Sequence, residues 1–196
     1  VIWASASDTF FSSGLDANYM LSLDRSEKLD MFRQLFETTR RVFAFSKPEL
    51  VLLPGHAFAA GSVLAMAADW RFMAEGKARV SFPEVMLGIS MPEAMIAMLR
   101  THVGEHQLAT LIGTGDSFKA EDCLRLGVVN ALSPREELLS QGEKFMRRLF
   151  QKPLGGFRAV KKNLRRNTLA FFENDPSLDD FERLMGFNFE EALRAT

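Results

Sequence analysis

The chain has 196 residues, of which 47% are hydrophobic and 25% are charged, so it can bury about 70% of its unfolded surface and fold without disulfides or metals. The 24 basic and 25 acidic residues leave a net charge of -1, which argues against a nucleic-acid partner or an anionic membrane surface. The single cysteine, Cys123, excludes an intrachain disulfide and a clustered-thiol zinc site and fits a reducing compartment, so we expect the cytoplasm and leave an organelle open.

The first half of the chain has the pattern of alternating strands and helices. Its apolar start over 1–6 predicts a buried strand that begins abruptly, so we expect strands upstream of it to be missing. The longest apolar run, 57–68, is interrupted by Gly61 and Ser62 and is too short for a membrane span. The further elements predicted here are a helix from an N-cap at Ser26 to Lys47, a strand over 49–53, a helix from about 57 to Asp69 after a turn at 54–56, and strands over 70–74 and 79–82.

The second half is mainly helical, because helix-starting prolines and helix-ending glycines recur at short intervals. One strand is predicted within it, over 128–132. The predicted helices cover 91–103, 105–112, 119–126, 134–150, 153–169 and 176–195. The sequence therefore predicts an α/β core followed by a helical C-terminal region.

Two turns of small residues and one embedded acid are the candidates for chemistry. The turn over 55–61 holds Gly55, Gly61 and three alanines, so a ligand could approach unpaired helix N-terminal amides, although tight packing of a strand on a helix explains the same residues. The turn over 11–16 follows a buried strand and is an ordinary loop when taken alone. Glu84 lies in an apolar stretch, which favours partial burial and a raised pKa suited to proton transfer.

Four segments of the chain stand in a distinctive order. They are Phe11-Ser12-Ser13-Gly14-Leu15-Asp16, the block from Lys47-Pro48 to Asp69-Trp70-Arg71, Phe82-Pro83-Glu84-Val85-Met86-Leu87-Gly88, and the stretch from Gly113-Thr114-Gly115 to Leu126-Gly127-Val128-Val129. Each is weak alone, but together they resemble the crotonase (enoyl-CoA hydratase/isomerase) superfamily. The resemblance covers most of residues 1–135 and fades beyond Pro153.

The resemblance implies an acyl-CoA-binding spiral of ββα units over 1–135 and a helical trimerisation region over 136–196, assembled as a homotrimer or hexamer. It implies that CoA enters as part of the substrate, with no separate cofactor and no metal. It places an oxyanion hole at the backbone N–H groups of Leu15 and Ala60, where a developing enolate would be stabilised. Ala60 replaces the family's middle glycine, which is harmless where φ is negative. The residues it assigns to substrate and CoA binding are Ser12, Ser13, Gly14 and Asp16.

Two further departures from the family pattern bear on the reaction. The second glutamate of the hydratases is Val63 here, so Glu84 is the single family acid, and one base is enough to move a proton from C2 to C4 of a 3-enoyl thioester. The lysines that often meet the nucleotide end of CoA are Thr9 and Asn18. Lys161, on a basic helix, is the candidate for that charge, with a solvated helix face as the alternative.

The sequence therefore favours an enoyl-CoA isomerase of fatty acid metabolism. Glu93, which follows Pro92 at a helix start, is the candidate second acid, and a first-turn acid that complements the helix dipole is the plainer interpretation. Two alternatives stay open, because a fold alone does not give an activity. One is another crotonase reaction, such as that of an enoyl-CoA hydratase or a thioesterase. The other is a non-catalytic acyl-CoA-binding protein.

Overall fold

The computed structural model describes residues 1–175 and residue 194, so the helix expected over 176–195 lies outside the described residues. Two four-stranded sheets form the framework of the fold. The first is wholly parallel, in the order β1 (Ile2–Trp3), β3 (Leu50–Leu53), β5 (Trp70–Ala74) and β8 (Ala131–Ser133). The second has the order β2 (Phe10–Ser12), β4 (His56–Phe58), β6 (Arg79–Ser81) and β7 (Ser117–Lys119), with β7 antiparallel to β6.

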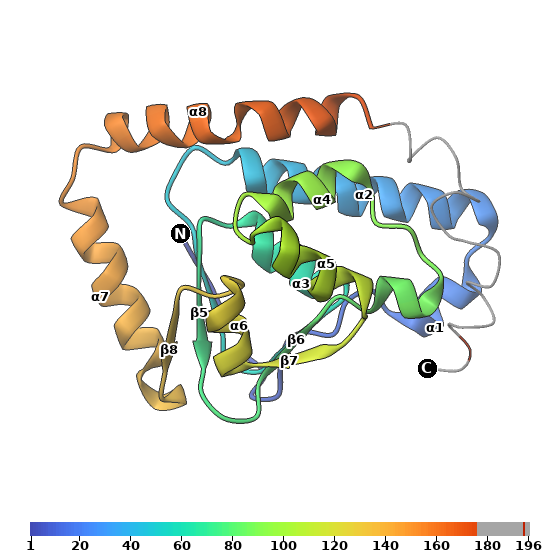
Figure 1. Ribbon diagram of the computed structural model, residues 1–196, viewed down its shortest axis with the longest axis horizontal. Coiled ribbons are helices and arrows are strands. Elements are labelled where there is room, and N and C mark those ends of the chain that lie inside the picture. Colours follow the sequence, from blue (N-terminus) through green and yellow to red (C-terminus); the bar gives the residue numbers. More distant parts are fainter. Residues whose placement is uncertain (176–193, 195–196) are drawn as a thin grey trace.

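The helices surround these sheets, with α8 lying along the top of the molecule over α2 and α4 (Figure 1). They are α1 (Ala17–Ser22), α2 (Arg25–Ala44), α3 (Ala60–Ala67), α4 (Glu93–Arg100), α5 (Glu105–Gly113), α6 (Ala120–Leu126), α7 (Leu138–Phe150) and α8 (Leu154–Glu173), with short 3-10 helices η1 (Pro83–Leu87) and η2 (Arg135–Glu137). Within the described part of the chain, no helix has the length and apolar character to cross a bilayer.

From β1 to β6, strands of the two sheets alternate along the chain, and helices follow each pair. β1 and β2 precede α1 and α2, β3 and β4 precede α3, and β5 and β6 precede η1 and α4. This is the succession of ββα units that the sequence resemblance implies. Consecutive strands such as β5 and β6 therefore lie in different sheets, although only a short turn separates them.

Strand β3 is buried on both faces, as its unbroken apolar sequence predicts. Leu50 and Leu52 belong to the apolar cluster under α7, whereas Val51 and Leu53 belong to the main core. Gly142 allows α7 to lie this close, because a Cβ on it would be 2.8 Å from Leu52 Cδ2. The first sheet is therefore a layer between α7 and the core.

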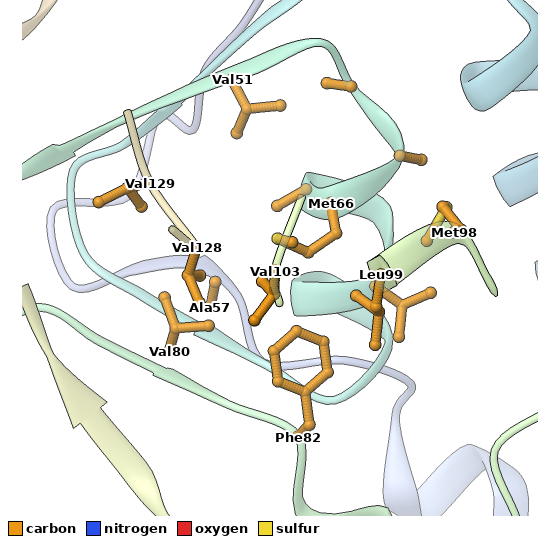
Figure 2. Packing of buried hydrophobic residues seen from close by; sticks show 14 of the residues in the cluster. Val51, Ala57, Met66, Val80, Phe82, Met98, Leu99, Val103, Val128 and Val129 are labelled. Atoms are coloured by element: carbon orange, nitrogen blue, oxygen red, sulfur yellow. The ribbon is translucent and has the colours of Figure 1, made fainter. Parts of the chain in front are cut away.

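The main core fills the space between the two sheets and helices α3 and α4. α3 is built from small and apolar residues, and nearly all of its residues are buried. Side chains from both sheets and both helices converge there (Figure 2), among them Val51, Ala57, Met66, Val80 and Leu99. The position of α3 is thus fixed by close packing on several sides.

Buried ion pairs hold α8 to the core. Asp69, directly before β5, lies 2.8 Å from Lys161 Nζ and 2.9 Å from Arg165 Nη2, and these three side chains are at most 9% exposed. Lys161 Nζ also lies 3.3 Å from Glu49 Oε2. Arg165 donates further hydrogen bonds to the carbonyl oxygens of Phe43 and of α3. One cluster of charges therefore joins α8 to the ends of α2, α3, β3 and β5.

This placement corrects the interpretation of Lys161 as a CoA-binding residue. Its ammonium group is enclosed by two carboxylates, so it can neither meet a nucleotide phosphate nor belong to a solvated helix face. The basic residues of α8 divide into inward-facing ones, Lys161 and Arg165, and exposed ones, Arg158, Lys162 and Arg166. The physical reason is that Glu49 and Asp69 lie far away in sequence and meet this helix only in the folded chain.

Arg71 closes the C-terminal end of α3. Its fully buried guanidinium donates hydrogen bonds to the carbonyl oxygens of Ala65 at 3.3 Å and Ala68 at 3.0 Å, and to that of Val128 at 2.6 Å. The helix end leaves such carbonyls without intrahelical donors. Burial lowers the pKa of Arg71 to about 9, so the side chain remains cationic at neutral pH.

Short strands account for the main differences between predicted and observed elements. The helix predicted after the turn at 54–56 begins only at Ala60, because β4 intervenes and pairs with β2 and β6. Three-residue strands such as β2 and β7 are too short to show alternation, and the sequence misses them. The N-cap of α2 is Asp24 rather than Ser26, and Glu27 completes its capping box.

Replacing Asp69 by Asn should strongly destabilise the fold. The amide keeps the shape of the side chain but removes the charge that compensates two buried cations, and breaking a buried ion pair costs about 3–5 kcal/mol. Asp122→Asn is the control, because Asp122 pairs with Arg125 at the surface and should cost less than about 1 kcal/mol. Urea unfolding followed by circular dichroism measures both. Equally small losses would show that the buried cluster does not hold α8.

Candidate active site

Two loops meet at the N-terminal end of α3, and glycines allow their contact. Gly14 has a φ of +100°, and a Cβ on it would lie 3.1 Å from Ala59 Cβ and 3.4 Å from Ala60 N. A Cβ on Gly61 would lie 2.6 Å from Ser12 Cβ. A side chain at either glycine would push the loops apart. Two backbone segments far apart in the sequence are therefore held side by side.

The N–H groups of Leu15 and Ala60 are the donors that this contact presents. Ala60 is the first residue of α3, so its N–H has no acceptor within the helix. Among the described residues, neither this N–H nor that of Leu15 donates to a backbone acceptor. Leu15 and Ala60 line the same cavity. Such donors suit an oxygen atom on which negative charge develops.

Ala59 carries backbone strain at this site. Its φ of 49° and ψ of -125° lie in a region that residues other than glycine rarely adopt. The N–H of Ala59 donates to Ser81 O of β6 at 3.1 Å while the next residue already begins α3. Ala60 has a negative φ, so alanine is harmless there, as the sequence predicts. The sequence by itself does not predict this strain; the signal for it is that the resemblance implies a run of three glycines where this chain has Ala59, Ala60 and Gly61.

Glu84 is the acid of the site, in the first turn of η1. Its Oε2 atom is buried and has no hydrogen-bond partner among the described residues. Burial raises the pKa of the Glu84 carboxyl to about 7, because desolvation penalises its charged form. A carboxyl that is half ionised near neutral pH can both accept and return a proton.

Glu84 shares a cavity of about 520 Å³ with Leu15 and Ala60, a volume typical of sites for small molecules. Of the described residues that line it, Glu84 alone is ionisable. No group of three metal-binding side chains occurs in the described ranges, 1–175 and 194. The walls are largely apolar and include Met20, Phe32, Leu35, Val63, Met86, Ile89, Met91 and Met95.

The predicted loop residues either line this cavity or support it. Ser13 is part of the lining. Ser12 and Asp16 shape the loop instead, because Ser12 Oγ accepts the N–H of Gly14 at 3.2 Å and Asp16 Oδ1 accepts the N–H of Tyr19 at 2.9 Å as the N-cap of α1. The structure thus gives these two side chains a local role in the turn before α1.

Two other positions distinguish the candidate reactions. Glu93 is exposed in the first turn of α4 and is not among the described residues that line the cavity, although its neighbour Pro92 is. It has the position of an acid that interacts with the helix dipole. Val63, in contrast, lines the cavity from α3. An apolar side chain therefore lines the cavity at the position where the sequence resemblance implies a second glutamate in hydratases.

A family model described as enoyl-CoA hydratase/isomerase matches residues 1–175 of the chain. The chain belongs to the enoyl-CoA hydratase/isomerase family. The crotonyl-CoA hydratase of Syntrophomonas wolfei subsp. wolfei is 30% identical over 152 residues, which are 78% of this chain and 58% of the relative. The peroxisomal enoyl-CoA delta isomerase 2 of Arabidopsis thaliana is 28% identical over 137 residues, which are 67% of this chain and 57% of the relative.

Solved structures share the fold of this family member. The human mitochondrial delta3-delta2-enoyl-CoA isomerase has a TM-score of 0.91 at 20% identity, covering 99% of this chain and 77% of the human one. The enoyl-CoA hydratase of Bacillus halodurans has a TM-score of 0.85 at 21% identity, covering 100% of this chain and 80% of the other. The crotonase-type α/β fold class is thus confirmed. The chain spans less than two thirds of the length of the curated relatives named above.

Ala59→Gly should stabilise the protein, whereas Ala60→Gly should not. Glycine adopts the backbone conformation of residue 59 without steric cost, which relieves about 1–3 kcal/mol of strain and exceeds the entropic cost of about 0.5–1 kcal/mol. At residue 60 the same change brings the entropic cost alone. Urea unfolding of the two variants measures the difference.

The two alanines also provide a functional control. Both glycine variants keep every backbone N–H, so both should retain most of their activity toward an acyl-CoA substrate. Equal losses of stability at the two positions would contradict the strain assigned to Ala59. Severe loss of activity in a well-folded Ala60→Gly variant would show that the oxyanion hole lies elsewhere.

Proposed function

We propose that this chain is an enoyl-CoA isomerase, which moves the double bond of a 3-enoyl-CoA to the 2-position. The observation that carries the proposal is one ionisable side chain, Glu84, in a described cavity lining that also holds the N–H donors of Leu15 and Ala60. Hydration needs a second group to hold and activate water, and Val63 offers none. The family match supports the coarser statement that the chain is an enzyme of the hydratase/isomerase group.

In the proposed reaction, the thioester carbonyl oxygen accepts hydrogen bonds from the N–H groups of Leu15 and Ala60. The Glu84 carboxylate takes a proton from C2, and the electron pair of that C–H bond enters a dienolate whose charged oxygen the two donors stabilise. Glu84 then returns the proton to C4, which leaves the double bond between C2 and C3. Atoms and electrons balance without a co-reactant, and CoA enters as part of the substrate.

Assembly through the helical region 136–196 belongs to the same proposal. On α8, the apolar side chains of Val160, Leu164 and Phe171 are 57%, 75% and 41% exposed. Their spacing of four and seven residues places them on one face of the helix. This face supports a trimer or hexamer in which copies of the chain meet through the helical region, while 1–135 binds the acyl-CoA.

Hydration remains the second candidate, since a relative named as a hydratase is among the most similar proteins.

The isomerase proposal predicts that 3-hexenoyl-CoA is isomerised far faster than crotonyl-CoA is hydrated. Val63→Glu should add hydratase activity if the water site is otherwise intact, and the unpaired buried carboxylate should lower stability by about 2–7 kcal/mol. Equal kcat/KM values for the two reactions in the wild-type protein would refute the isomerase assignment.

Glu84→Gln should abolish most turnover while acyl-CoA binding is kept. The amide preserves the shape of the side chain but removes the base, so kcat should fall by about 10²–10⁴. Glu93→Gln is the matched control and should change kcat little, because Glu93 is exposed outside the described lining. Single-turnover loss of the 3-enoyl substrate separates chemistry from binding. If neither change matters and ligand still binds, the non-catalytic alternative is correct.

The pH dependence gives an independent check on Glu84. The base must be ionised, so kcat/KM should rise with pH and reach half its maximum near 7, the raised pKa of Glu84. The unfolded chain releases this proton near 4.5, so stability relative to Glu84→Gln should fall as the pH rises from 4.5 to 7. Urea unfolding across that interval tests the sign, and a flat difference would contradict the buried carboxyl.

A further inference from the structure

The cavity separates two apolar clusters of the protein. On one side Met20 is packed by Leu15, Phe32 and Ile89 in a small cluster of its own. On the other side Val63 belongs to the main core. Residues of both clusters line the same 520 Å³ space. Protein interiors rarely leave voids much larger than a water molecule, so a space of this size between two apolar clusters suits an apolar ligand.

Helix α1 is the thin wall of this space. Among its residues Met20 alone is buried, at 4% exposure, whereas the adjacent Tyr19 points outward and is 59% exposed. Met20 is therefore the main contact of the helix with the cavity, with Ala17 and Leu21 packed beside it. Methionine is unbranched and adapts to irregular spaces. The side chain of Met20 can therefore adjust its conformation to a ligand while it still limits the depth of the cavity.

The wall formed by α1 and α2 offers no polar partner to a ligand. Its described lining side chains beyond Ala17 are Met20, Phe32 and Leu35. A carboxylate or hydroxyl brought against them would lose its hydration without gaining a hydrogen bond. The group that contacts this wall must therefore be hydrocarbon.

We propose that this wall selects an unsubstituted, straight acyl chain of medium length, and that Met20 sets the length limit. The inference rests on the proposed function, because it takes the thioester end of the substrate to lie at Glu84. The 520 Å³ of the cavity equals roughly 17 water volumes at about 30 Å³ each, and a methylene group is of similar size. After the thioester and its neighbouring atoms are accommodated, room for roughly eight to ten carbons is left.

Binding of saturated acyl-CoAs tests this, because they occupy the site without reacting. Calorimetric titration of the full chain with butyryl-, octanoyl- and palmitoyl-CoA should show affinity rising by about fourfold per added methylene up to octanoyl. Palmitoyl-CoA should gain nothing further. Octanoyl-CoA that carries a terminal carboxylate should bind at least about 100-fold more weakly than octanoyl-CoA, because the charge would be desolvated.

Variants of the wall test the role of Met20. Met20→Ala deepens the cavity by about two to three methylene groups, so at about fourfold for each methylene the affinity ratio of palmitoyl- to octanoyl-CoA should rise by about 16- to 64-fold. Phe32→Ala opens the same wall from α2 and should raise the ratio in the same direction, which keeps the test valid if one variant does not fold. Tyr19→Ala, on the outer side of α1, is the matched control and should leave the ratio unchanged.

The outcomes separate this inference from the proposed function. A ratio that stays at the wild-type value in both enlarged variants, or affinity that does not grow from butyryl- to octanoyl-CoA, overturns the assignment of the wall. Equal binding of the carboxylated and plain octanoyl thioesters does the same. Length-dependent binding without isomerisation of 3-octenoyl-CoA supports the wall and refutes the isomerase.

Discussion

The candidate site depends on the backbone at 58–61 lying directly against the backbone at 12–15. Gly14 and Gly61 have no side chain that would collide with Ala59 or Ser12 of the opposite segment. Ala59 adopts an unfavourable φ of 49°, and α3 begins directly after it at the point of contact. Leu15 and Ala60 line one cavity for this reason. Donors held in place by main-chain packing need no reorganisation when charge develops on a bound oxygen.

The rest of the fold keeps that contact rigid by holding the other end of α3. This helix has eight residues, so a shift at its C-terminal end would be passed directly to its N-terminal end. Arg71 binds the carbonyl oxygens at that end, and Arg165 adds a hydrogen bond to Ala67 O at 3.2 Å. Asp69 in turn pairs with Arg165. Asp69, Arg71 and Arg165, which lie around the start of β5, therefore position the site without taking part in its chemistry.

Three buried carboxyl groups in the described part of the chain differ in their partners. Asp69 and Glu49 are paired with cations, whereas Oε2 of Glu84 has no partner among the described residues. Burial raises the pKa of Glu49 as well, but the cation of Lys161 opposes that shift. The Glu84 carboxyl lies in an apolar cavity with no cation to oppose desolvation, and its pKa is raised to about 7. This contrast supports Glu84 as the group that moves protons, and it explains why other buried acids are poor candidates.

The sequence alone determined the buried strand β3, the two small-residue loops and the acid in its apolar segment, and the order of its motifs implied the ββα succession through the family resemblance. Local periodicity, turn residues and the order of the motifs indicate each of these features. The tertiary structure decided the burial of Lys161, the strain at Ala59, the three-residue strands and the apolar wall at Met20. A basic helix has the same sequence pattern whether its cations face water or carboxylates brought from residues 49 and 69. Partners distant in sequence, and the space left between them, arise only when the chain packs.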